Sequence, residues 1–207
     1  HLDKSKVPTG LLLDYAMDLV DFEKYTGKYL TDSNYVSISD FQDMLRSIRS
    51  ASVAKSPPLK DVSSITANFE RIASTNKITI GNVLYRYNYI LANALSDNLI
   101  RYDESLEEVS DNYIDDKWMN PYGEKYLFGI TPSSIICSEN SSYQIDAEYF
   151  FYNIQNISKL ELDPGDGDGY RTIRIGEACN SLNGGFRQAS AAIPLQASRL
   201  RGRIRKS

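Results

Sequence analysis

The sequence predicts an α+β protein in which N-terminal helices and a β-strand region precede an immunoglobulin-like β sandwich. Two segments before residue 75 have helical periodicity, residues 77–91 alternate with a period of two, and short alternating segments fill residues 125–177. Helices and strands in separate blocks are typical of the α+β class. The expected parts are an α+β region at 1–120, an immunoglobulin-like β domain, complete or not, at 121–177, and a basic tail at 178–207.

Two helices are predicted from apolar spacing. In residues 40–52 apolar side chains recur at i, i+3, i+4 and i+7, and Ser39 with Gln42 has the spacing of a capping box. Residues 62–74 repeat the pattern on one stripe, formed by Ile65, Phe69 and Ile72. We expect these helices to pack against each other.

A long strand is predicted over residues 77–91, with a bulge at Gly81 and Asn82. Three tyrosines share one face of this strand, namely Tyr85, Tyr87 and Tyr89. Two interpretations of the row stay open. The rings pack in a core or between domains, or they form an aromatic platform that binds a glycan, since flat rings stack on sugar faces. The three tyrosines are therefore candidate ligand-binding residues.

Residues 103–116 form an acidic connector with seven carboxylates, and we expect a domain boundary after it, at about residue 120. Most runs of charge are solvated, so a linker or a solvated helix face is the first interpretation. A loose calcium site and acid–base catalysis by paired carboxylates are the alternatives.

The segment DPGDGDG, residues 163–169, lies between two alternating stretches and predicts a hairpin turn. A calcium loop is the alternative, with Asp163, Asp166 and Asp168 as ligands. The EF-hand register fails, because a glycine at loop position six puts Pro164 at position one and Ile175 at position twelve. The expected cofactor is therefore none, with calcium as the open alternative.

Composition excludes several classes of function. All 27 acidic side chains and 17 of the 23 basic ones lie in residues 1–177, so this body carries a formal charge of −10 and would repel nucleic acid. The single histidine is His1, which argues against histidine-based catalytic relays and HExxH zinc sites. No apolar run reaches the length of about 20 residues that a membrane-spanning helix needs, so we expect no membrane insertion.

Residues 178–207 carry six basic side chains and lack sustained periodicity. We expect a disordered tail or one foreign to the fold; contact with nucleic acid, or with the acidic body, is the alternative. Cys137 and Cys179 either form one disulfide bridge or are free thiols.

The stretch LELDPGDGDGYRTIRIGE is similar to the DFGDG hairpin of PKD-like domains of immunoglobulin type. In that family the Asp and Gly residues shape a turn between two strands. Pro164 replaces the usual aromatic residue here, the preceding Trp is absent, and the loop is longer.

A wider resemblance covers residues 3–177. The segments DKSKVPTGLLLDYA, ITIGNVLYRYNYI, YLFGITP and GDGDGY, in this order, resemble the opening part of large secreted proteins from gliding bacteria and their anaerobic relatives. This resemblance implies an extracellular or cell-surface location, with a signal peptide that lies outside the sequence or has been removed. It supplies no catalytic residues.

We therefore predict a non-catalytic structural or interaction module of a secreted or cell-surface protein, whose partner is a protein or a glycan at the cell surface. The alternative is a carbohydrate-binding accessory segment of a secreted hydrolase. An enzyme that uses carboxylates alone is the third hypothesis.

Overall fold

The computed structural model describes residues 1–17, 19–26, 36–53, 59, 61–72, 77–134, 142–154, 157, 159–163, 168–180, 188–192 and 199–203. Three short 3-10 helices come first: η1 (Lys4–Lys6), η2 (Leu13–Tyr15) and η3 (Phe22–Tyr25). The α-helices are α1 (Ile38–Ala51) and α2 (Val62–Arg71). The strands are β1 (Lys77–Ile90), β2 (Ile100–Asp103), β3 (Glu108–Asp111), β4 (Tyr113–Ile114), β5 (Lys117–Trp118), β6 (Tyr122–Pro132), β7 (Ser142–Tyr152), β8 (Lys159–Asp163), β9 (Arg171–Ile173), β10 (Ala178–Asn180), β11 (Gln188–Ala192) and β12 (Arg199–Arg203).

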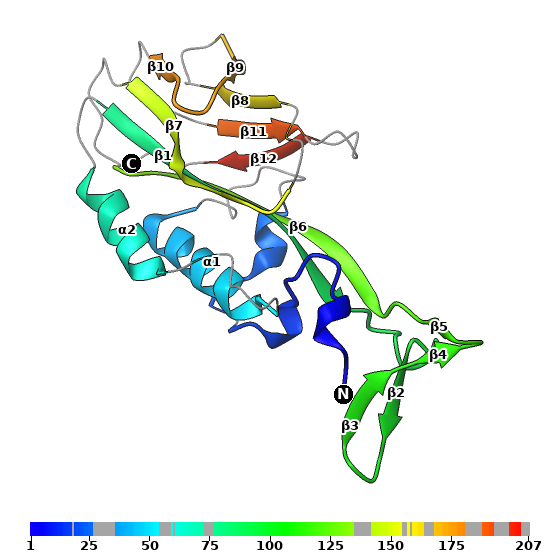
Figure 1. Cartoon of the computed structure of the whole chain (residues 1–207). Coiled ribbons are helices and arrows are strands. Elements are labelled where there is room, and N and C mark those ends of the chain that lie inside the picture. Colours follow the sequence, from blue (N-terminus) through cyan, green and yellow to red (C-terminus); the bar gives the residue numbers. More distant parts are fainter. Residues whose placement is uncertain are drawn as a thin grey trace.

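A central sheet of order β10-β7-β1-β6 organises the molecule (Figure 1). β1 runs antiparallel to β6 along its length and parallel to β7. Its register with β7 shifts between Ile80 and Asn82, because Ile80 faces Ile145 whereas Asn82 faces Phe150. The predicted long strand and its irregularity near Gly81 are therefore confirmed, and the extra residues lie in β7.

Helices cover one face of the central sheet. α1 buries Phe41, Met44, Leu45 and Ile48 against this face, which is the stripe that the apolar spacing predicts. From the sheet, the odd-numbered residues of β1, such as Val83, join the same core. The predicted helix is confirmed, but it begins at Ile38, because the capping box is made by Ser37 and Asp40 and not by Ser39 and Gln42.

The second helix agrees with its prediction in part. Its predicted stripe has Phe69 fully buried, with Ile65 partly buried, while Ile72 lies beyond its last residue at 36% exposure. α2 begins at Val62 after Asp61, whose side chain accepts a hydrogen bond from Ser63 N. α1 and α2 lie side by side on the central sheet (Figure 1).

A second sheet, of order β12-β11-β8-β9, covers the opposite face. The even-numbered β1 residues Ile78, Ile80 and Leu84 pack in one core with Leu162 of β8 and Ile173 of β9. The result is three layers, with helices, central sheet and second sheet in that order. β1 is therefore buried on both faces, which explains why its two alternating sets are both rich in apolar side chains.

The α+β class is confirmed, but the immunoglobulin-like sandwich is not. Immunoglobulin domains pair two antiparallel sheets, whereas the parallel pair of β1 and β7 makes the central sheet mixed, and helices cover one of its faces. The expected boundary at about residue 120 is also not a boundary between separate sheets. β1 and β6 lie on opposite sides of it and pair over eleven residue pairs, from Ile80–Pro132 to Ile90–Tyr122.

The tail expected at 178–207 contains strands where the structure describes it. β10 pairs with β7, and β11 lies between β8 and β12. These strands are parts of the central and second sheets, which differs from the disordered tail that the composition predicts. Over the described residues, no helix is long and apolar enough to cross a membrane.

Candidate functional site

Residues 100–118 form two hairpins, β2–β3 and β4–β5, which we call the arm. Figure 1 shows the arm beyond the ends of β1 and β6, away from the helices and the second sheet. The sequence predicts that most of this segment, residues 103–116, is an acidic connector. The structure corrects that interpretation, since the carboxylates occupy strands and tight turns.

Both turns place residues in the left-handed region. Asp115 and Asp116 have φ values of 49° and 60°, as the two central residues of a type I′ turn require. Glu107, the last residue of the β2–β3 loop, has φ 51°. At the start of that loop the Asp103 carboxylate accepts hydrogen bonds from Ser105 Oγ at 2.6 Å and Ser105 N at 2.9 Å, which lower the pKa of Asp103.

A small hydrophobic cluster joins the base of the arm to the start of the chain. Leu2, Ala94 and Ile100 are buried together, and Val109 of β3 packs against them. The N-terminal segment therefore contributes apolar surface to the arm.

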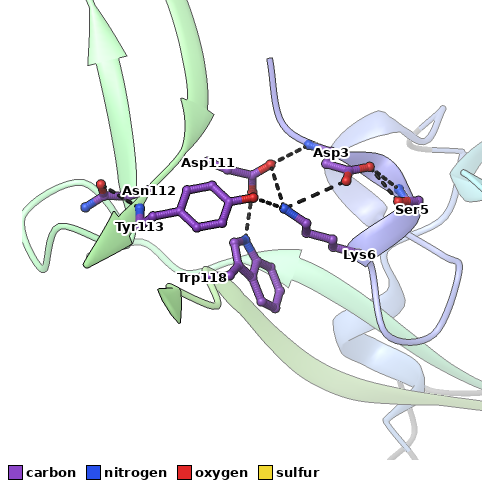
Figure 2. A network of polar contacts seen from close by, with 7 residues as sticks. All are labelled: Asp3, Ser5, Lys6, Asp111, Asn112, Tyr113 and Trp118. Carbon is purple, nitrogen blue, oxygen red and sulfur yellow. Dashed lines mark hydrogen bonds and ion pairs between the residues drawn. The ribbon is translucent and has the colours of Figure 1, made fainter. Parts of the chain in front are cut away.

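Polar contacts complete this junction, which we call the Lys6 anchor: Asp3, Ser5, Lys6, Asp111, Tyr113 and Trp118 (Figure 2). Asp111 is its centre, with its side chain only 9% exposed. Its Oδ2 accepts from Asp3 N at 2.8 Å, and its Oδ1 accepts from Trp118 Nε1 at 2.9 Å. Both carboxylate oxygens of Asp111 are thus used across three segments of chain.

Lys6 supplies the positive charge of this anchor. Its Nζ donates to the Tyr113 hydroxyl and lies 3.8 Å from Oδ2 of both Asp3 and Asp111. It also lies 4.7 Å from the Tyr113 ring centroid and 5.6 Å from that of Trp118. The hydrogen bond to Tyr113 is the largest cause of a raised pKa for Lys6, so the ammonium stays charged at neutral pH.

The arm exposes apolar side chains among its carboxylates. Leu106 is 65% exposed at the tip of β2–β3, Tyr102 is 48% exposed and Ile114 is 46% exposed. Seven carboxylates and two basic side chains, Arg101 and Lys117, give residues 100–118 a formal charge of −5. Such a surface can pair with basic groups while its apolar side chains supply contact area.

The tyrosine row does not form an open platform. Tyr85 and Tyr87 are 2% and 1% exposed and pack in the core beneath the helices. The rings of Phe22 and Tyr87 form an edge-to-face pair there, with centroids 5.2 Å apart. Burial raises the pKa of Tyr85 to about 12 and raises that of Tyr87 as well. For Tyr85 and Tyr87, the structure therefore agrees with the interpretation that the row packs in a core.

Tyr89 is the member of the row that keeps exposed surface. It lines a pocket of about 410 Å³ with Asp14, Asp21 and Glu23. Lys125 Nζ lies 4.5 Å from the Tyr89 ring centroid and pairs with Glu23. The pocket thus combines an aromatic ring with three carboxylates, and each carboxylate already has a partner: Glu23 has Lys125, as just described. Asp14 accepts from Ile90 N at 2.9 Å, and Asp21 accepts from Glu23 N at 3.0 Å.

The predicted hairpin at residues 163–169 is confirmed, because β8 and β9 pair antiparallel around it. Asp168 forms an ion pair with Arg171 at 2.9 Å, and Gly169 has φ +77°. Asp163 ends β8, while Asp166 lies outside the described residues. Within the described part of the chain, no group of three or more potential metal ligands is found. Cys137 and the Cys179 side chain, which either form a disulfide bridge or are free thiols, lie outside the described residues.

Sequence reasoning missed the Lys6 anchor, because its residues are about a hundred positions apart. Lys6 and Asp111 carry no motif, and only their contact reveals the role. One signal was present in the sequence: Asp115-Asp116 between Ile114 and Lys117 suits a two-residue hairpin turn, since Asp tolerates the left-handed region.

Comparisons with protein-family models, with curated proteins and with solved structures give no match for this chain. The functional argument therefore depends on the geometry of the arm and of the pockets.

Proposed function

We propose that this chain is a non-catalytic interaction module of a secreted or cell-surface protein, and that the arm is its contact surface. The observation that carries the proposal is the arm itself, which projects from the central sheet, is fixed at its base by the Lys6 anchor and exposes Leu106 at its tip. Tyr102 and Ile114 are exposed on the same arm, so a partner that covers it would remove several apolar side chains from water and not Leu106 alone.

The arm favours a protein partner with basic side chains around an apolar contact. Its formal charge of −5 would attract such a surface from a distance, and Leu106 and Tyr102 would provide the desolvated centre. The Lys6 anchor fixes the base of the arm before binding, which reduces the entropy that binding must offset.

An extracellular location is part of the same proposal. The likeness of residues 3–177 to the opening part of secreted proteins supports it. Protease treatment of intact cells that make the full-length protein tests this location. Surface proteins are cleaved under these conditions, and full protection would contradict the proposal.

Photo-crosslinking tests the arm directly. A photoreactive amino acid at position 106 is compared with one at position 17, because Met17 is equally exposed, at 62%, but lies outside the arm. We expect one partner, identified by mass spectrometry, to be captured from position 106 and not from position 17. The capture should weaken at higher salt, since exposed charges are screened. Equal capture from both positions would reject the arm as the contact surface.

Carbohydrate binding is the second candidate function, and the pocket beside Tyr89 favours it. The tyrosine ring can stack on the face of a sugar, while oxygen atoms of the neighbouring carboxylates accept hydrogen bonds from the sugar hydroxyls. The suitable test is a glycan array with Tyr89→Ala, because Tyr87→Ala would empty a core position. Binding by the native chain that Tyr89→Ala abolishes would support this function, and unchanged binding would exclude the pocket.

A further inference from the structure

A groove of about 930 Å³ opens between the end of β7 and the β8–β9 hairpin. Its apolar lining includes Phe150, Ile154, Leu160 and Ile173. These residues also belong to, or pack against, the core between the central and second sheets. The groove is therefore an opening into the apolar layer between two sheets, and its volume falls in the range of roughly 300–1,000 Å³ that is usual for small-molecule sites.

An aromatic pair forms part of its wall. The rings of Phe150 and Tyr152 stack with centroids 5.1 Å apart and an interplanar angle of 29°. Tyr152 is 52% exposed, and Thr172, which also lines the groove, is exposed too. This wall offers flat apolar surface with a few hydroxyl groups at its edge.

The charges that line the groove are all positive among its described residues. They are Lys159 and Arg174. Lys159 pairs with the buried carboxylate of Glu161 at 2.7 Å, so its charge is largely compensated. The guanidinium of Arg174 forms no ion pair with any described residue and is exposed to solvent. Arg174 is thus the group that can receive an anion at the mouth of the groove.

We propose that this groove binds an elongated amphiphile with an anionic head group, of the class of medium-chain carboxylic acids. The chain lies along Phe150, Tyr152 and the aliphatic side chains, where its transfer from water is favourable. The carboxylate lies at Arg174. A sugar fits less well, because its hydroxyl groups would meet aliphatic walls that offer few hydrogen-bond partners.

Isothermal titration with decanoate, below its micelle concentration, tests the proposal on the whole chain. We expect saturable binding at one site. Methyl decanoate, which keeps the chain but lacks the charge, should bind about five- to tenfold more weakly, which corresponds to the net contribution of one solvent-exposed hydrogen bond. Arg174→Gln should weaken decanoate binding by the same factor and leave methyl decanoate unaffected.

Two controls and one wall variant make the result specific. Arg71→Gln removes an exposed arginine at the end of α2, on the other face of the central sheet, and should not change binding. Tyr152→Ala removes an exposed wall residue and should weaken both ligands. The arm plays no part in this site, so a Leu106→Ser variant should bind decanoate normally, and the two proposals can fail separately.

Several outcomes would overturn the inference. Equal affinity for decanoate and its methyl ester would show that Arg174 does not select an anion. Binding without saturation, or equal effects of Arg174→Gln and Arg71→Gln, would show that the groove is not the site. Absence of decanoate binding together with binding of a uronic acid oligosaccharide that Tyr152→Ala weakens would assign the groove to glycans.

Discussion

Gly81 lies where β1 passes beneath the two helices, and its missing side chain is a packing requirement. A Cβ atom at this position would lie 2.9 Å from Phe41 Cζ and 3.0 Å from Phe69 Cζ, and both rings are fully buried. We expect Gly81→Ala to lower the free energy of unfolding by about 1–3 kcal/mol, because the packed rings cannot move away without strain. Urea unfolding measures this loss.

Gly123 offers a matched control on the neighbouring strand. A Cβ there would meet the outer end of the Tyr89 ring at 2.4 Å, but this ring is partly exposed and can turn toward solvent. Gly123→Ala should therefore cost less than Gly81→Ala. Adding Phe41→Leu should recover part of the loss caused by Gly81→Ala. If the two alanine variants unfolded at the same urea concentration, crowding at Gly81 would not be the cause.

At the scale of elements, the arm depends on one cation. Lys6→Met keeps most of the apolar stem but removes the ammonium that contacts Tyr113 and lies near Asp111. We expect faster amide hydrogen exchange in residues 108–118, with little change in the melting temperature, because the arm can open locally while the layered body stays folded. Hydrogen exchange followed by mass spectrometry measures the opening of the arm, and a thermal melt measures the stability of the layered body.

Lys117→Met is the control for this variant, since Lys117 is an exposed cation in the arm outside the anchor. It should leave exchange at Trp118 and Asp111 unchanged. Equal exchange in the Lys6→Met variant and the unaltered chain would show that the apolar cluster of Leu2, Ala94 and Ile100 alone holds the arm.

The elements differ in how much of them the sequence can predict. α1 and β1 are local patterns, and their apolar spacing predicts them well. The parallel pairing of β1 with β7 leaves no local trace in the sequence, which therefore predicts a separate sandwich over residues 121–177. One feature of the sequence does indicate that β1 is a central strand. Val83 and Leu84 are adjacent and both apolar, as expected in a strand that is buried on both faces.

The candidate sites show the same difference between local patterns, which the sequence predicts, and contacts between distant residues, which it does not. The hairpin at residues 163–169 depends on neighbouring residues and was predicted, whereas the Lys6 anchor joins residues far apart and was not. The tyrosine row was found, but its environment depends on η3 and the helices above it. Alternation alone does not distinguish a solvent face from a face that another layer covers.

The layered body as a whole places neutral tyrosines in its interior, and this should limit its stability in alkali. Burial raises the pKa of Tyr85 to about 12 and also raises that of Tyr87, whereas tyrosine in an unfolded chain ionises near pH 10. Above about pH 10 the unfolded chain therefore loses protons that the folded chain keeps. The stability contributed by these groups is complete below that pH and declines as the pH rises toward the folded values.

We therefore expect the free energy of unfolding to fall, from about pH 10 upward, by up to about 1.4 kcal/mol per pH unit for each of these two tyrosines. Urea unfolding at a series of pH values measures the slope. Tyr87→Phe should reduce this slope by the contribution of one ionising group. The Tyr87 hydroxyl is buried and has no hydrogen-bond partner among the described residues, so this variant should be at least as stable as the unaltered chain near neutrality. Identical slopes for Tyr87→Phe and the unaltered chain would mean that Tyr87 already ionises in the folded state, and hence that water reaches the core between the helices and the central sheet.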